Sequence, residues 1–343
     1  MNNIDFKKLG DYVKIKTGKL DANASSEDGE YPFFTCSIEP LKISSYSYDC
    51  ECCLVAGNGD LNVKYYNGKF DAYQRTYIIE SLDKEKLDVM YLYFFLSSYI
   101  EVLRKQSIGG VIKYIKLGNL TDALIPIPEL SKQKEICQNL IKAKKILSSN
   151  ENLLSKYDTL IKSRFIEMFG DPKINSSNLP TKKFIEVVKL QRGFDLPVQE
   201  RNQDGLFNVY GSNGPLDKHD SFKVKAPGIV TGRSGTLGNV YYVLEDYWPL
   251  NTTLFSVDIH NNNVVYLKYL LELYDLSRFS EGAGVPTLNR NIVHNKDIID
   301  VPLSLQNDFA AFVQQIDKSK FAVQKSLEKA ETLYKSLMQE YFG

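Results

Sequence analysis

Long hydrophobic runs are missing from this sequence of 343 residues. No stretch reaches the roughly eighteen consecutive apolar residues that a membrane-spanning helix needs. The opening residues, MNNIDFKKLGDYVKI, are amphipathic and lack the apolar core of an export signal. We therefore expect a cytoplasmic protein, and the length allows two or three domains.

The formal net charge is zero, because 42 basic residues balance 42 acidic ones. A chain that holds nucleic acid by bulk electrostatic attraction carries a net positive charge, so the balance argues against such a chain. It leaves open a chain with local basic loops, and one whose partner supplies most of the phosphate contacts.

Recognisable metal ligands are scarce. The chain has five cysteines and three histidines. Cys50, Cys52 and Cys53 stand close together, but no second Cys-x-x-Cys and no pair of histidines lies at a zinc spacing. We expect reduced thiols without disulfides, and we expect no metal and no cofactor.

Catalytic motifs are missing as well. There is no Asp-Pro-Pro-Tyr loop of the amino-methyltransferase type and no Gly-x-x-x-x-Gly-Lys-Ser/Thr phosphate loop. The glycine-rich segment GRSGTLG at 232–238 follows an apolar run as a dinucleotide loop would. However, the following NVYYVL is β-branched and aromatic, which favours a strand, a turn and a second strand. We expect no enzymatic activity.

An internal duplication is the strongest positive feature. Adding 173 to a residue number links identical residues without a gap, where chance would match roughly one position in sixteen. A chain of two equivalent halves tends to form a pseudo-two-fold object, which suits a target with two half-sites. The matches include Ser131 with Ser304, Gln133 with Gln306, Glu167 with Glu340 and Phe169 with Phe342.

The two copies are clearest in two long helical segments, 129–170 and 303–343. Apolar residues recur there at alternating steps of three and four, which is typical of helices that pack along their length. Such a stripe is often only the face of a helix that is buried in a domain core. However, these helices of nearly forty residues, roughly 55 Å each, are longer than an ordinary domain is deep. We expect the two to pair, antiparallel if a two-fold axis relates them, with Ser131 and Ser304 as N-caps. The seams are Ile136, Leu140, Ala143, Leu147, Asn150, Leu154, Tyr157, Ile161, Arg164 and Met168, and Phe309, Val313, Ile316, Lys320, Val323, Leu327, Ala330, Tyr334, Leu337 and Tyr341.

The remaining segments predict an α+β fold with two similar globular domains. The first, 1–128, has β-rich runs such as CCLVAG and YQRTYIIE and a helix near KLDVMYLYFFLSSYIEVLRKQ. The second, 181–302, repeats the order with GIVTG, NVYYVL and TTLFSV and a helix near VVYLKYLLELYDLSRF. A polar linker at 171–180 follows the first long helix.

Loop tips supply the candidate contact residues, because they carry donors that suit base edges or phosphates. Plain solvated turns are the alternative. In the second domain the candidates are Tyr210, Ser212, Asn213, Arg233, Ser234, Thr236, Asn289 and Arg290. In the first domain they are Thr35, Ser37, Asn58, Arg75, Lys113, Tyr114 and Lys116.

The run LIPIPELSKQKEICQNLIKAKKIL, with the FGDP that follows its helix, resembles the specificity subunit of Type I restriction-modification enzymes. It resembles the end of that family's target recognition domain and the start of its spacer helix. IIDVPLSLQNDFAAFVQQIDKSK repeats the element with a less typical SLQNDF opening. TGRSGTLGNVYY and GAGVPTLNRNIV resemble segments inside the recognition domains, so the resemblance covers essentially the whole chain.

The resemblance implies a non-catalytic subunit whose two target recognition domains each read one half of a bipartite site in double-stranded DNA. It further implies two antiparallel helices that act as a ruler, two DNA methyltransferase (modification) subunits, and restriction subunits that translocate DNA. Two alternatives remain at this stage. One is a specificity component of a Type IIB or IIG-like system or an antirestriction decoy. The other is a coiled-coil scaffold that does not bind DNA.

Overall fold

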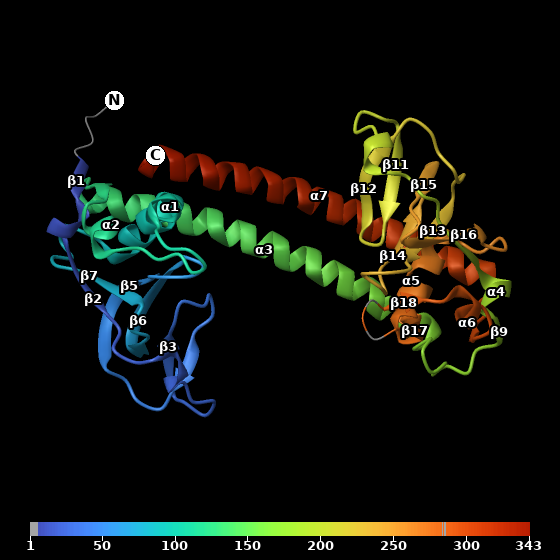
Figure 1. The fold of residues 1–343 in the computed structure, drawn as a ribbon, viewed down its shortest axis with the longest axis horizontal. Helices are drawn as coiled ribbons and strands as arrows, with labels where there is room; N and C mark the ends of the chain where they lie inside the picture. The colour runs from blue at the N-terminus through green and yellow to red at the C-terminus, as the bar shows by residue number, and fades with distance from the viewer. Residues whose placement is uncertain (1–5, 283, 285) are drawn as a thin grey trace. The chain divides into compact units, whose positions relative to one another are not determined.

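Two compact units make up the chain. The computed structural model describes residues 6–282, 284 and 286–343. One unit comprises Met1–Asn150 with Ser326–Gly343, and the other comprises Glu151–Lys325. Each contains one mixed domain and part of both long helices, α3 (Leu130–Phe169) and α7 (Leu303–Phe342) (Figure 1). In the described part of the chain, no helix has the length and apolar character needed to span a membrane.

The first unit is built on a six-stranded sheet in the order β2-β7-β5-β6-β3-β4. Its pairs are antiparallel except for β3 with β6, which run parallel. The helix α1 packs on β5 and β6. The elements are β1 (Phe6–Lys8), β2 (Val13–Thr17), β3 (Tyr31–Phe34), β4 (Leu41–Ile43), β5 (Tyr48–Ala56), β6 (Val63–Ala72), β7 (Thr76–Ser81), α1 (Val89–Gln106), α2 (Leu117–Thr121) and β8 (Leu124–Pro126).

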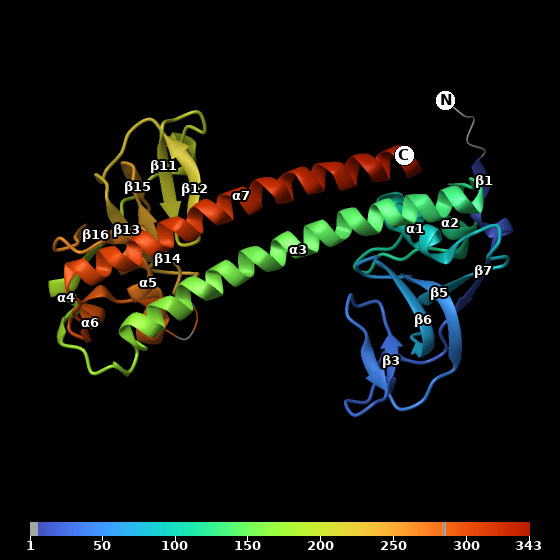
Figure 2. The same ribbon diagram turned by 180° about the vertical axis from the view of Figure 1, so that it is seen from behind.

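The second unit has a four-stranded sheet, β10-β16-β13-β14, and a three-stranded sheet, β12-β11-β15. The helix α5 packs on β13 and β14 (Figure 2). The elements are β9 (Thr181–Lys183), α4 (Phe184–Val187), β10 (Lys189–Arg192), β11 (Phe207–Gly211), β12 (Gly214–His219), β13 (Gly228–Gly232), β14 (Val240–Val243), β15 (Tyr247–Pro249), β16 (Thr253–Asp258), α5 (Val264–Tyr274), β17 (Ser280–Glu281), β18 (Thr287–Leu288), α6 (Arg290–His294) and β19 (Asp297–Ile299).

The predicted elements are confirmed, with differences of one to five residues at their ends. GRSGTLG joins the antiparallel strands β13 and β14, so the segment is a turn between strands and opens no helix. The helix predicted to continue to Phe279 ends at Tyr274, because Asp275 adopts the left-handed conformation with φ of 60°. A 3-10 turn, Leu276–Phe279, follows.

A buried glutamine marks the duplication in the folded chain. The Gln133 side chain accepts a hydrogen bond from Asp88 N at 2.9 Å, and that of Gln306 accepts one from Asn263 N at 2.8 Å. Asp88 and Asn263 are the N-caps of α1 and α5. Each glutamine also donates to the chain that enters its own long helix, at Pro128 O and Val301 O. The repeat therefore extends to buried hydrogen bonds.

The predicted serine N-caps are wrong. Ser131 and Ser304 are the second residues of α3 and α7, which begin at Leu130 and Leu303. The carbonyls of Glu129 and Pro302 start the helical hydrogen bonds. The chain entering each helix is held by the buried glutamine side chain in place of a serine hydroxyl.

The two long helices run antiparallel, as the pairing within each unit shows. In the first unit, the Asn139 side chain lies 3.5 Å from Tyr341 Oη, and that of Asn150 lies 3.1 Å from Ser326 Oγ. Residue numbers thus rise along α3 as they fall along α7.

The second unit shows the same direction. Lys320 Nζ lies 2.6 Å from the Asp158 carboxylate, and the rings of Phe165 and Phe309 are 5.3 Å apart. Every predicted seam residue is buried or half-buried, so the seam and the antiparallel coiled coil are confirmed.

Candidate nucleic-acid interface

Four segments of the second domain meet where β13 ends, and backbone hydrogen bonds hold them together. Arg233 N donates to Thr252 O at 2.8 Å, and Leu288 N donates to Arg233 O at 2.8 Å. Gly193 N donates to Thr253 O at 3.1 Å. The ends of β10 and β13, the start of β16 and the strand β18 therefore form one rigid frame.

The first domain contains the same frame. Gly57 N donates to Arg75 O at 2.8 Å, and Ile115 N donates to Gly57 O at 2.9 Å. Gly18 N donates to Thr76 O at 3.0 Å. We call this four-segment arrangement the platform. In the first domain it comprises 17–18, 57–58, 75–76 and 114–117, and in the second it comprises 192–193, 233–234, 252–253 and 287–290.

Close backbone approach explains the glycine that opens each platform. A Cβ atom on Gly18 would stand 2.1 Å from Ala72 O, and one on Gly193 would stand 2.2 Å from Leu250 O. No side chain tolerates such a contact with backbone, so glycine lets the first strand of each platform lie against the neighbouring loop.

A cleft of 360 Å³ opens on the platform of the second domain. The predicted residues Arg233, Asn289 and Arg290 line it together, although they come from segments more than fifty positions apart. Arg192 lines the same cleft and was missed from the sequence, although it directly precedes Gly193. Within the described residues, none of the three arginines forms an ion pair with a carboxylate. Glu281 also lines the cleft, so its lining carries three arginines against one carboxylate.

Other predicted residues of the second domain lie near by. Ser212 Cβ lies 3.3 Å from the point that a Cβ on Gly232 would occupy, so the β11–β12 turn borders the platform. Ser212 is half-buried, and its neighbour Asn213 is exposed. Ser234 forms an isolated bridge with Thr287, and Thr236 is exposed in the turn beyond it.

In the first domain, most of the predicted residues also gather on the platform. The Asn58 side chain accepts a hydrogen bond from Cys36 Sγ at 2.9 Å, and Asn58 forms a bridge with Tyr114. Lys113 O accepts a hydrogen bond from Gly59 N at 3.0 Å. Ser37, Arg75, Lys113 and Tyr114 are exposed. Lys116, in the last segment of the platform, lines a separate 290 Å³ pocket.

Two predicted contact residues have little free side chain. Thr35 is 6% exposed, and its hydroxyl accepts a hydrogen bond from Ser37 N. Tyr210 is 9% exposed, and its ring packs against Tyr247. Burial also raises the pKa of the Tyr210 phenol. These two side chains are buried and pack inside their domains, so the exposed residues around them are the better candidates for contact.

His294 ties the strand that carries Arg192 to the helix that carries Arg290. Its Nε2 accepts a hydrogen bond from Leu190 N at 3.0 Å, which joins α6 to β10. Burial, followed by the charges of Arg290 and Lys189, lowers the pKa of His294. A neutral imidazole suits this acceptor role.

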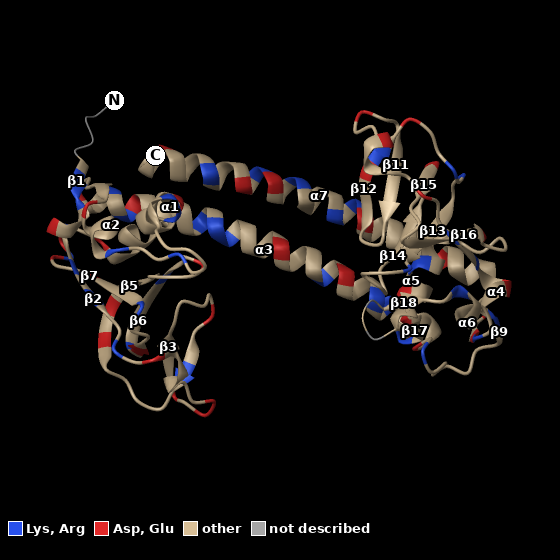
Figure 3. Cartoon of the chain, in the orientation of Figure 1, with Lys and Arg blue, Asp and Glu red and all other residues tan. Residues whose placement is uncertain are grey.

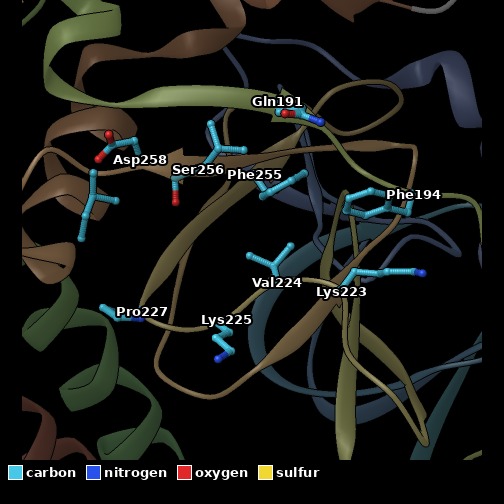
Figure 4. A pocket seen from close by; sticks show the side chains of 11 residues that line it. Gln191, Phe194, Lys223, Val224, Lys225, Pro227, Phe255, Ser256 and Asp258 are labelled. Carbon is cyan, nitrogen blue, oxygen red and sulfur yellow. The ribbon is translucent and has the colours of Figure 1, made fainter.

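A second cleft lies on the other side of β10. Consecutive residues of a strand point to opposite faces, so Gln191 lines this 540 Å³ cleft while Arg192 faces the platform. Lys223, Lys225 and Phe194 also line it (Figure 4). Basic and acidic residues are interspersed over both units, in keeping with the zero net charge (Figure 3).

The described residues contain no group of three or more histidine, cysteine, aspartate or glutamate side chains that could hold a metal ion. All five cysteines are free thiols. The polar groups of the platforms are hydroxyl, amide, ammonium and guanidinium groups, which bind anions and base edges.

The family model of the Type I restriction modification DNA specificity domain matches the chain twice, at residues 1–156 and 177–331. The chain belongs to this family. The two matches contain one platform each, and together they confirm the internal repeat.

Two curated relatives are similar in sequence. The EcoDI specificity subunit of a Type I restriction enzyme from Escherichia coli is 42% identical over 139 residues, which are 40% of this chain and 31% of that subunit. A putative type I specificity subunit from Mycoplasma pneumoniae is 23% identical over 257 residues, covering 69% of this chain and 67% of the relative.

Solved structures share the fold. The S subunit of a Type I restriction-modification system from M. genitalium has a TM-score of 0.71 at 18% identity, covering 100% of this chain and 97% of that one. A chain from a study of complex assembly in the type I restriction-modification system has a TM-score of 0.59 at 14% identity, covering 98% and 97%.

Proposed function

We propose that this chain is the DNA sequence-recognition subunit of a Type I restriction-modification assembly, in which each globular domain reads one half of a bipartite site in double-stranded DNA. The observation that carries the proposal is the platform, which occurs twice on equivalent hydrogen bonds. In this role the chain itself catalyses nothing and works on cytoplasmic DNA.

The platforms suit DNA because rigid backbone holds their donors. Arg192, Arg233 and Asn289 border one cleft, while Arg75 and Tyr114 are exposed on the other platform. A rigid frame fixes side chains at low entropic cost, and specific readout of base edges needs such fixed donors. The neutral net charge supports an assembly in which other subunits supply many of the phosphate contacts.

Partners supply the chemistry in this proposal. Two methyltransferase (modification) subunits bind the chain and methylate adenine, and restriction subunits translocate and cleave the DNA. The curated relatives support this, since they are named as specificity subunits of type I systems.

The paired helices set the number of base pairs between the half-sites. Each helix has 40 residues, which corresponds to about 60 Å at 1.5 Å per residue. Antiparallel pairing supports such a ruler, because a seam of matched residues resists sliding.

The test is to map N6-methyladenine across the genome of a host that carries the gene with its modification and restriction genes, and of the same host lacking only this gene. We expect one asymmetric bipartite motif to lose its methylation on deletion. A methylome that is identical in both strains would refute the proposal, and a gene-dependent motif without a central unspecific spacer would refute the two-reader arrangement.

A further inference from the structure

The two platforms can be compared position by position, because the same hydrogen bonds define equivalent residues. Gly57 and Arg233 each donate to the segment that starts β7 or β16 and each accept from the segment before α2 or α6. Gly57 is therefore equivalent to Arg233. The acceptors of their amides, Arg75 and Thr252, are equivalent in turn.

The remaining positions follow from the same bonds. Gly18 and Gly193 are equivalent through their bonds to Thr76 and Thr253, which makes Thr17 the counterpart of Arg192. Ile115 and Leu288 donate to the equivalent carbonyls, which makes Leu117 the counterpart of Arg290. The bridges Asn58–Tyr114 and Ser234–Thr287 agree with this register.

The side chains at equivalent positions differ, and the basic groups stand at different places in the two platforms. The second platform presents three guanidinium groups, from Arg192, Arg233 and Arg290, where the first presents Thr17, Gly57 and Leu117. The first platform has Arg75 where the second has Thr252, and Lys116 where the second has Asn289. One backbone frame thus carries two different sets of hydrogen-bonding groups.

We propose that Arg192, Arg233 and Arg290 are the guanine-reading residues of the second domain. The half-site of this domain therefore contains guanine. The equivalent residues of the first domain, Thr17, Gly57 and Leu117, read no guanine. The inference rests on the proposed function and identifies which residues set its specificity. Arg192 belongs to this set, although it lies in none of the loops from which the contact residues were predicted.

The chemistry favours base edges. A guanidinium group donates two parallel hydrogen bonds to O6 and N7 of guanine in the major groove, a pairing that no other base offers. The three arginines line one 360 Å³ cleft with Asn289 and Glu281, and within the described residues no ion pair joins Glu281 or another carboxylate to them. Arg192 and Arg290 are further tied to each other through His294, which joins β10 and α6.

The test uses substitutions that the equivalent platform already accommodates. Arg192→Thr, Arg233→Gly and Arg290→Leu each install the residue found at the same place in the first domain. A second series, Arg192→Lys, Arg233→Lys and Arg290→Lys, keeps the charge but removes the planar fork. Lys225→Thr, on the cleft behind β10, is the matched loss of one charge from the same unit.

Each variant is expressed with the cognate subunits, and the methylated motif is mapped. We expect one half of the motif to lose its requirement for a guanine in both series, with the other half unchanged and Lys225→Thr keeping the wild-type motif. In binding assays with the purified complex, the preference for guanine over adenine at that position should fall roughly ten- to hundredfold.

Three results would overturn the inference. The first is a wild-type motif without guanine in either half. The second is an unchanged motif in every arginine variant. The third is a uniform loss of affinity on all sequences with a shallower dependence on salt, which would identify the arginines as phosphate contacts. A wild-type strain without any gene-dependent motif would instead count against the proposed function itself.

Discussion

Phe342, in the last turn of α7, packs against Tyr91 of α1 with the ring centroids 5.2 Å apart. Its duplicate, Phe169 at the end of α3, packs against Tyr266 of α5 at 5.3 Å. Each globular domain therefore contains the start of one long helix and the end of the other. The two halves of the chain fold by exchanging helix ends, which makes the antiparallel pairing part of each core.

This exchange predicts which domain is destabilised by a substitution in a long helix. Phe169 is 1% exposed, so Phe169→Ala should lower the free energy of unfolding by about 3–5 kcal/mol, and the half-buried Phe342 should contribute about 1–3 kcal/mol. Hydrogen exchange read by mass spectrometry should show Phe342→Ala loosening α1 and Phe169→Ala loosening α5. Leu333→Ala, at a residue 50% exposed, is the control and should change little. Loosening of α5 by Phe342→Ala would contradict the exchange.

Thiol chemistry gives a second prediction. Cys52, Cys53 and Cys137 are buried, and burial raises the pKa of Cys137 to about 12 and holds that of Cys53 well above its usual value. These thiols stay protonated at pH 8, and protonated thiols react slowly with alkylating reagents. Iodoacetamide should therefore modify Cys36 first in the native protein and spare the buried three until the chain is unfolded. Peptide mapping after timed quenching checks the order, and early modification of Cys53 would refute it.

Stability of the second domain should depend on pH through His294. Its pKa is lowered in the folded state by burial and by the charges of Arg290 and Lys189. The unfolded chain therefore binds a proton near pH 6.5 that the folded chain does not bind, and stability is lost as the pH falls below that value. His294→Gln keeps an acceptor for Leu190 N but cannot titrate, so it should flatten this part of the profile. Urea titrations at pH 7.5, 6.5 and 5.5 measure the free energy of unfolding. If it fell equally with pH in the wild type and in His294→Gln, His294 would not be the cause.

The sequence was most informative where the pattern is long. The seams of α3 and α7 follow a heptad spacing over about forty residues, so both the helices and their pairing could be predicted, and the 173-residue repeat predicted two similar domains. The strand and turn at 232–238 were also predictable, because β-branched and aromatic residues follow the glycines.

Local geometry was harder to predict. Adding 173 to the number of Gly57 gives Val230, whereas the hydrogen bonds make Arg233 its counterpart, because the loops of the two domains differ in length. Arg192 was missed since it ends a short strand and looks like any solvent-facing position until β18 and α6 close the cleft around it. Tyr210 looked like a loop residue, yet the parallel pairing of β11 with β15 covers its ring. These contacts join distant segments, and no local pattern encodes them.

The most direct test of the central claim, that two readers are spaced by paired helices, is to lengthen both helices together. Seven residues are inserted between Asn150 and Glu151 and seven between Lys325 and Ser326, where α3 and α7 face each other. Seven helical residues add about 10.5 Å, or about three base pairs of DNA. Methylome mapping should then return both original half-sites with a spacer about three base pairs longer. An unchanged spacer between unchanged half-sites would contradict the account.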